Sequence, residues 1–519
     1  MRKFFPIILI VIALSARLLP GPRTIDDSYI TFRYSQNILA GNGFTYNSGE
    51  HVLGTTTPLY TLILTAVGSI FGGVQAPFPI ISWLLNSILD AVSCLILFII
   101  GKKVATYRIA IIASLTWAIA PFSVTFSIGG LETSLFVLLL LFTAFFYLSE
   151  QASGMWLCAS FLILTRPDAL IFILPLVLIG LVTKMKYGLF RIIPITIGLL
   201  PLMAWIVFSI IYFGSPIPNS LMAKSVAYFL PENAALIRFI QHYLTPFNEQ
   251  YTLLPKALYV GLISLPIFYV LGSLSIFRKN PATVPILIYP LLYFVTFSLA
   301  HPLIFRWYLT PPLPFYYLII FAGMENLLMR FIQIAKKFLD RTFPGDSFQP
   351  RFNLEKAFET IITLFLMLPL FLTMNAWVIK LDHGNATPTP EMAWVKLEEI
   401  YRKTSFDVLE YTYPDDLIAA GDVGVLGYFT GRRILDTVGL NSPIASSYYP
   451  LPEDAYAINY AIPTQLILDQ KPEMVIFLEI YGRNTLLKSP DFLSQYQLLK
   501  EYPTTLYGSD GMLLYQKID

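Results

Sequence analysis

Long apolar blocks separated by short polar turns dominate the first three quarters of this chain. A helix crosses a bilayer with about twenty consecutive apolar residues, and about eleven blocks approach that length before residue 381. Residues 154–165 are too few to cross alone, so we expect them to extend or tilt against a neighbour. The blocks are 1–19, 78–101, 107–125, 131–148, 154–165, 168–183, 189–213, 256–277, 282–300, 307–329 and 356–380.

Basic residues recur at alternate ends of these blocks, and cytoplasmic loops carry the excess of Lys and Arg. We therefore predict that these ends face the cytoplasm and that the first block runs from inside to outside. No small-residue cleavage site follows residue 19, so an uncleaved first span is expected rather than a signal peptide. The basic groups are Lys102-Lys103 with Arg108, Lys184 with Lys186 and Arg191, Arg278-Lys279, and Arg330 through Arg351.

This topology leaves residues 21–77 and 214–255 outside the membrane. The first of these segments contains an apolar stretch, 56–72, which is short for a span and flanked by Thr, Pro and Gly. We expect an interfacial or re-entrant helix there rather than a true span. The turn Ser149-Glu150-Gln151 is the exception to the charge pattern, because it is predicted to be cytoplasmic and has no basic residue.

After residue 380 the pattern changes to that of a soluble domain. Short strand-like runs at Leu417–Ala420, Met474–Leu478 and Met512–Tyr515 are separated by turn formers and by a helical stretch at 391–411. The chain therefore divides into a transmembrane domain, 1–380, and a small extracytoplasmic α/β domain, 381–519. The fold class predicted is an α-helical polytopic membrane protein with a C-terminal α/β domain.

Composition agrees with a membrane protein. Of the 519 residues, 55% are hydrophobic and 13% charged, and the mean hydropathy is +0.63. Soluble domains carry about 25% charged residues. The net charge of +2 is too small to indicate a nucleic-acid partner. Both cysteines, Cys94 and Cys158, lie in apolar blocks and are expected to be small buried hydrophobes.

Two adjacent carboxylates, Asp26 and Asp27, follow the outer end of the first span where a helix is expected to start. One interpretation is helix capping, since a carboxylate at a helix N-terminus accepts backbone N–H bonds. The other is general base catalysis. Glycosyl transfer to a hydroxyl requires a carboxylate that takes the acceptor proton while the leaving group departs from the opposite face.

Several motifs resemble the glycosyltransferase C superfamily, in the same order along the chain. The resemblance is closest to the branch of cell-wall arabinofuranosyltransferases, with its ArnT-related and protein-mannosyltransferase-related members. The motifs are Asp26–Tyr34, Gly41–Phe44, Asn47–Glu50 and Thr57–Leu59 in the first external segment, then Gly129–Thr133, Thr165–Asp168, Tyr212–Ser220 with Lys224, Phe305–Leu309, Gly421–Tyr428 and Asp436–Leu440.

The resemblance implies an enzyme that uses a polyprenyl-phosphate sugar and carries an acidic catalytic base in its first external segment. That role falls on Asp27 or Asp26, and we favour Asp27. The expected reaction is an inverting transfer to a glycan or glycolipid acceptor at the outer face of a bacterial plasma membrane. The soluble domain is expected to help orient the acceptor.

Basic residues at the membrane boundary are costly unless they serve a site, and three of them are candidates to hold the donor phosphate: Arg306, Lys224 and Arg166. The alternative for each is snorkelling to the interface. Candidates for acceptor binding or for a second acid are Glu132, Tyr29, Arg33 and His51. Glu132 can alternatively pair with one of the arginines.

Metal binding is left open, with Asp26, Asp27 and Glu132 as the oxygen ligands if a divalent cation such as Mg²⁺, Mn²⁺ or Ca²⁺ takes part. The distant histidines His51 and His301 are not a metal signature. The glycines of 421–427 do not have the spacing of a dinucleotide fingerprint and indicate a turn. Asp90, inside the second span, is expected to pair with a polar neighbour or face a cavity rather than to relay protons.

Three other functions compete with this one. A lipid-linked sugar flippase or small-solute transporter would place its polar groups near the bilayer midplane, whereas here they gather at one edge. A non-catalytic scaffold would tolerate loss of both aspartates. A protein O-glycosyltransferase of the same superfamily would use the same chemistry on a polypeptide acceptor. The sequence does not name the sugar, the acceptor or the linkage.

Overall fold

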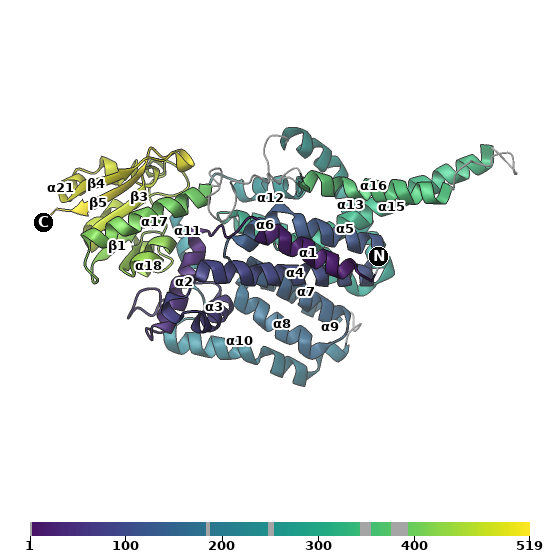
Figure 1. Cartoon of the computed structure of the whole chain (residues 1–519), viewed down its shortest axis with the longest axis horizontal. Helices are drawn as coiled ribbons and strands as arrows, with labels where there is room; N and C mark the ends of the chain where they lie inside the picture. The colour runs from purple at the N-terminus through teal and green to yellow at the C-terminus, as the bar shows by residue number, and fades with distance from the viewer. Residues whose placement is uncertain (1–2, 183–186, 248–253, 343–353, 375–392, 519) are drawn as a thin grey trace.

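A helical bundle with a small mixed α/β domain at one end makes up the molecule (Figure 1). The computed structural model describes residues 3–182, 187–247, 254–342, 354–374 and 393–518. The predicted domain boundary near residue 381 lies outside the described residues. The first described helix of the C-terminal domain begins at Ala393.

Each predicted apolar block coincides with a helix or with a pair of helices. Within the described ranges, six helices are long and apolar enough to cross a membrane, or seven if one bent pair is a single span. The total of about eleven spans therefore stays a prediction. The long helices are α4 (Phe78–Val104), α10 (Ile192–Phe213), α13 (Leu254–Lys279), α14 (Val284–Ala300), α15 (Leu313–Thr342) and α16 (Leu354–Met374).

The other apolar blocks form helices of 13 to 16 residues. They are α1 (Phe5–Leu18), α3 (Pro58–Ile70), α7 (Thr133–Leu148), α8 (Ala152–Thr165) and α9 (Leu170–Val182). At 1.5 Å per residue, α3 is about 20 Å long, which is short of the roughly 30 Å of a bilayer core. Its length fits the interfacial or re-entrant helix predicted for 56–72.

The block 107–125, predicted as one span, is broken. Helix α5 (Tyr107–Ile119) and helix α6 (Pro121–Ile128) meet at an angle of 45°. Proline has no N–H for the helical ladder and disfavours helical backbone at the residue before it. Accordingly Ala120 is extended, with φ −60° and ψ 131°, and Pro121 starts the new helix.

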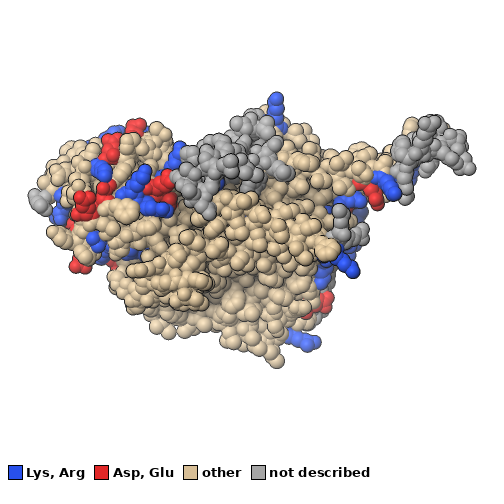
Figure 2. Space-filling model, viewed as in Figure 1, with Lys and Arg blue, Asp and Glu red and all other residues tan. Residues whose placement is uncertain are grey.

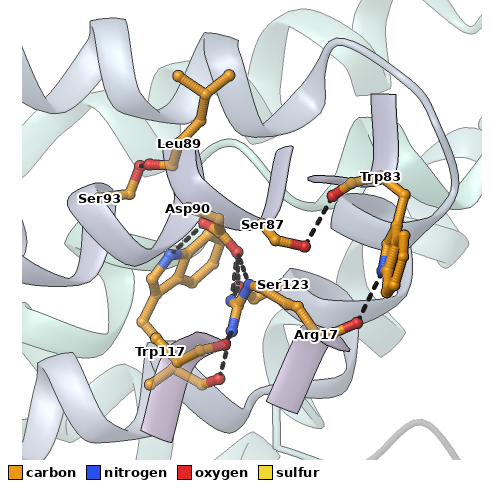
Figure 3. A network of polar contacts seen from close by, with 10 residues as sticks. Arg17, Trp83, Ser87, Leu89, Asp90, Ser93, Trp117 and Ser123 are labelled. Atoms are coloured by element: carbon orange, nitrogen blue, oxygen red, sulfur yellow. Dashed lines mark hydrogen bonds and ion pairs between the residues drawn. The ribbon is translucent and has the colours of Figure 1, made fainter. Parts of the chain in front are cut away.

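A buried ion pair ties α1 and α4 to this break (Figure 3). Arg17 Nε donates to Asp90 Oδ2 over 2.7 Å, and Ser123 Oγ and Trp117 Nε1 donate to the same carboxylate over 2.9 and 3.0 Å. Arg17 also donates to the carbonyl of Ala118 beside the break. The prediction that Asp90 pairs with a polar neighbour is confirmed.

The loops predicted to be cytoplasmic meet at one end of the bundle. Lys103 Nζ donates to Ser149 Oγ over 2.9 Å, and Lys279 donates to the carbonyl of Ala105. Arg108 pairs with Glu325 over 3.3 Å. The turn at 149–151, which has no basic residue of its own, therefore receives one from the neighbouring loop.

The C-terminal domain contains a five-stranded sheet of order β2-β1-β3-β5-β4. Strand β1 is parallel to β2 and β3, whereas β5 is antiparallel to β3 and β4. The predicted strands β1 and β3 are confirmed residue for residue, and the third extends further, to Lys517. The strands are β1 (Leu417–Ala420), β2 (Arg433–Asp436), β3 (Met474–Leu478), β4 (Tyr496–Tyr502) and β5 (Met512–Lys517).

Charge divides the molecule along its long axis. On the face shown in Figure 2, charged side chains gather on the C-terminal domain and at the opposite end, with a broad band between them that is almost without charge. A surface without charged side chains is suited to contact with lipid tails, which offer no partners for polar groups. The C-terminal domain therefore lies beyond one edge of this band, next to α2 (Asp26–Leu39) and α11 (Asn219–Ala227).

Candidate active site

Helix α2 attaches the first external segment to the C-terminal domain. The carboxylate of Asp26 accepts hydrogen bonds from the N–H groups of Gly424 (3.0 Å) and Val425 (2.8 Å), at the start of α18 (Gly424–Thr430). Asp26 thus caps a helix, but a helix of the other domain instead of its own. A Cβ at Gly424 would overlap the carbonyl oxygen of Asp26, so only glycine allows this approach. Burial, and next the charge of Asp422, raise the pKa of Asp26 well above its ordinary value, opposed by these hydrogen bonds.

Two further residues of α2 lie in the same interface. The hydroxyl of Tyr29 donates to Glu398 (2.8 Å) on α17 (Ala393–Tyr411). The guanidinium of Arg33 donates to the carbonyls of Tyr46 (2.8 Å), Arg432 (2.7 Å) and Gly427. Both side chains are buried. Their polar groups are therefore used for docking between the domains, and neither residue lines the cavities described next.

Asp27, one residue further along α2, is partly exposed and lines a cavity of about 360 Å³. This cavity lies between the rim of the bundle and the C-terminal domain, and Arg306 and Asp422 also line it. A smaller adjoining cavity of about 50 Å³ is lined by Asp27, Asp422 and Lys224. Asp26 also lines both cavities, but it is buried and its carboxylate oxygens accept backbone N–H groups of α18.

The two cations beside Asp27 come from separate external segments. Arg306 opens the short turn η6 (Arg306–Leu309) ahead of α15, and Lys224 lies on α11. The Lys224 ammonium is 4.8 Å from the centre of the Phe305 ring. Burial lowers the pKa of Lys224, but Tyr308, Asp27 and Glu132 together raise it above its ordinary value. Lys224 is therefore a cation held in the electrostatic field of Asp27.

Arg166 and Glu132 form a separate buried cluster. Arg166 Nε and Nη2 donate to the two carboxylate oxygens of Asp168 over 3.0 and 2.9 Å, and its Nη1 lies 3.6 Å from Glu132 Oε1. The hydroxyl of Tyr293 donates to the same Asp168 over 3.0 Å. Arg166 thus already has a carboxylate partner, and neither it nor Glu132 lines the two cavities.

The remaining candidates lie elsewhere. The exposed ring of His51 stacks on Tyr212, with 4.1 Å between ring centres, outside both cavities. Among the residues that the structure describes, no group of three His, Cys, Asp or Glu side chains could hold a metal ion. Asp26, Asp27 and Glu132 therefore do not form the three-carboxylate site considered from the sequence.

Sequence reasoning missed Asp422, which it treated as part of a turn. This residue follows β1 directly, at the carboxyl end of a strand with two parallel neighbours, where ligand sites form in α/β sheets. Its carboxylate accepts a hydrogen bond from the buried Tyr401 over 3.1 Å. Burial raises the pKa of Asp422 to about 7, helped by the charges of Asp27 and Asp436 and opposed by Tyr401.

Asp436 has a different task although it borders the smaller cavity. Its carboxylate accepts hydrogen bonds from the N–H groups of Val438 and Gly439 at 3.0 Å and of Asn441 at 2.9 Å. These bonds hold the turn after β2. The sequence signal Asp436–Leu440 is thus explained by backbone structure.

Comparisons with known proteins agree with this architecture. The family described as a domain of unknown function (DUF8728) matches residues 393–515, that is, the C-terminal domain alone. No curated protein matches the sequence. ArnT from Cupriavidus metallidurans, solved with bound undecaprenyl phosphate, is 12% identical, with 99% of this chain and 96% of that chain covered and a TM-score of 0.54.

A second similar structure is the archaeal oligosaccharyltransferase AglB from Archaeoglobus fulgidus, solved in complex with an inhibitory peptide and a dolichol-phosphate. It is 11% identical, covers 99% of this chain and 74% of that chain, and has a TM-score of 0.56. The chain therefore shares the fold of these two solved structures over almost its whole length. The resemblance found in the sequence motifs is confirmed at the level of the fold.

Proposed function

We propose that this protein is a glycosyltransferase that moves a monosaccharide from a polyprenyl-phosphate donor to a glycan or lipid-linked acceptor at the outer face of the plasma membrane. The observation that supports it most is the convergence of Asp27, Arg306 and Lys224 on two adjoining cavities. These residues lie on α2, at the start of η6 and on α11, and so come from three distant parts of the chain.

The proposed reaction is a single displacement with inversion. The Asp27 carboxylate takes the proton of the acceptor hydroxyl as that oxygen attacks the anomeric carbon. The bond between that carbon and the phosphate oxygen breaks, and the polyprenyl phosphate leaves with the electron pair. Arg306 and Lys224 bind this phosphate, Arg through its planar fork and Lys as a point charge.

Asp27 suits the role of base better than Asp26 does. A general base must reach the proton that it abstracts. Both aspartates line the two cavities, but Asp27 is partly exposed whereas Asp26 is buried. Both carboxylate oxygens of Asp26 already accept backbone N–H groups of α18. Arg166 is not assigned to the phosphate in this scheme, because it lines neither cavity and donates two hydrogen bonds to Asp168.

The arrangement of charge also favours transfer over transport. A carrier would hold its substrate near the bilayer midplane. The buried charged pair on α1 and α4, Arg17 and Asp90, is satisfied by its own protein partners. The charged groups that line the two cavities, by contrast, lie between the bundle and the C-terminal domain.

The test compares envelope glycans of a deletion strain and its parent by mass, followed by complementation with variants. Asp27→Asn should leave the missing sugar unrestored, because general base catalysis contributes about 10²–10⁴-fold in rate. Asp415→Asn, an exposed aspartate in the turn before β1, is the matched control and should restore it.

Binding of undecaprenyl phosphate to the purified protein separates the roles of these residues. Arg306→Gln and Lys224→Gln should weaken it, and Asp27→Asn should not. Full restoration of the glycan by Asp27→Asn at normal protein levels would refute the assignment of the base.

A further inference from the structure

The C-terminal domain forms one wall of the larger cavity, and this wall has no role in the reaction proposed above. Four aromatic side chains line it: Trp394 on α17, Tyr460, Tyr481 on α20 (Glu479–Gly482) and Tyr507 in the short turn η11 (Leu506–Gly508). Tyr228 and Trp307 face the same space from the bundle side. Rings of this kind offer flat apolar surface together with a polar edge. The apolar C–H face of a sugar ring matches such surface.

One polar group in this wall lacks a partner. The indole N–H of Trp394 is buried and has no hydrogen-bond acceptor among the described residues. Buried donors are almost always satisfied, and an orphan calls for an explanation. The nitrogen has almost no accessible surface, so the ring must shift before an oxygen atom of a ligand in the cavity can supply the missing acceptor.

The position of Asp422 relative to Asp27 is fixed by neighbouring bonds. Asp26 binds the N–H groups of Gly424 and Val425, while the residues next to this contact, Asp27 and Asp422, both line the two cavities. The hydroxyl of the buried Tyr401 donates a hydrogen bond to the Asp422 carboxylate and so fixes its position. Two carboxylates from opposite domains therefore border one space.

We propose that this wall is the acceptor subsite, that the acceptor is an uncharged sugar, and that Asp422 binds its hydroxyl groups and positions one of them against Asp27. The inference rests on the proposed function. The acceptor belongs on this side because the polyprenyl donor must approach from the membrane side of the cavity. An anionic sugar is disfavoured by the two carboxylates, whose like charges would repel it.

A sugar fits these groups better than a polypeptide does. Carboxylates accept hydrogen bonds from hydroxyl groups, and an indole N–H donates to a hydroxyl or ring oxygen. Aromatic faces and a few convergent polar groups are also the usual lining of a small-molecule site. Asp422 is thus a positioning residue for the acceptor, and Asp27 remains the catalytic residue.

The experiment uses the full-length protein in lipid nanodiscs, with substrates taken from the deletion strain. That strain should accumulate both the unused lipid-linked donor and the unmodified acceptor. Its lipid extract supplies the donor, and its envelope is separated into neutral glycan, acidic glycan and protein fractions as acceptors. Products are identified by mass, and the acceptor KM and kcat are measured for each variant.

Transfer to the neutral glycan fraction is expected. Asp422→Asn should raise the acceptor KM at least tenfold and change kcat less than threefold, with undecaprenyl phosphate binding unchanged. Trp394→Phe, which removes only the N–H group and one ring, should raise the same KM about threefold to tenfold. The matched control is Asp469→Asn, on the exposed surface of the same domain, which should leave the KM unchanged.

Two results would overturn the inference and leave the proposed function standing. One is transfer confined to the protein or acidic glycan fraction. The other is an unaltered acceptor KM in both Asp422→Asn and Trp394→Phe, with Asp27→Asn inactive. If the wild-type protein transfers no sugar and binds no undecaprenyl phosphate, the proposed function fails and the inference fails with it.

Discussion

Neighbouring aspartates in this chain carry out different tasks, and the difference comes from where their oxygens find hydrogen-bond donors. Both residues line the cavities, but the Asp26 carboxylate accepts the two N–H groups at the start of α18, whereas Asp27 is partly exposed. No pattern in the sequence separates them, because the donors belong to residues 424 and 425. The choice of Asp27 as base from the sequence stays a prediction, now supported by its access to the cavities.

The raised pKa of Asp422 predicts a dependence on pH. Its carboxyl group is protonated below pH 7 and becomes an acceptor for sugar hydroxyls as pH rises through about 7. The acceptor KM should therefore fall several-fold between pH 6 and pH 8, measured by steady-state kinetics. In Asp422→Asn this fall should vanish. Asp26 and Asp436 also have raised pKa values, so a fall that persists in the variant would assign the titration to one of them.

At the scale of elements, the helices were predictable and the junctions between them were not. A bilayer demands long apolar runs, so nearly every helix of the bundle can be read from composition. Strands β1 and β3 are fully apolar runs and were also predictable. Strand β2 was missed because two charged residues, Arg433 and Asp436, flank its two apolar residues, and β4 because most of its residues are exposed.

The break at Pro121 had a local signal in the proline itself, yet a long apolar run was read as one span. Asp422 had a local signal too, a carboxylate directly after a strand. The first external segment gives no indication that it docks there. Contacts between α2 and the C-terminal domain join residues almost 400 positions apart, and local patterns do not encode such pairs.

The close contact of α2 with α18 predicts that adding one methyl group at Gly424 lowers both the activity and the stability of the protein. Gly424→Ala places a Cβ against the carbonyl oxygen of Asp26 and should separate the two helices. We expect at least a tenfold loss of transfer activity and a lower thermal unfolding temperature of the purified protein. Gly431→Ala is less suitable as a control because Gly431 has a φ of +65°.

The exposed Ser447→Ala in the same domain serves as the control and should unfold like the wild type. A Gly424→Ala protein that is as active and stable as the wild type would show that the domains dock in another way.

The ion pair of Arg17 and Asp90 predicts non-additive effects. Leaving one charge of a buried pair without its partner costs about 3–5 kcal/mol. Arg17→Met and Asp90→Leu should each reduce the yield and thermal stability of the protein severely. The double variant should recover much of the loss, because apolar replacement of both partners leaves no unpaired charge. A double variant as unstable as the sum of the two single variants would contradict this account.

On the scale of the whole molecule, the site lies at the end opposite the loops that Lys103 and Lys279 join. If those loops are cytoplasmic, as the charge pattern predicts, the cavities open outside the cell. Ser447→Cys should then react with a membrane-impermeant maleimide in intact cells, and Lys103→Cys only after permeabilisation. The two native cysteines lie within apolar helices. The reverse labelling pattern would place the reaction in the cytoplasm.

The bond between Asp26 and the start of α18 also has a consequence for biosynthesis. These partners are 398 residues apart, so the ribosome has made most of the protein before the second of them exists. The nascent helices can insert in the membrane one after another, but the cavity walls remain incomplete until the last domain has been made and has folded against α2. A partly synthesised chain therefore has no assembled centre with which to consume its lipid substrate.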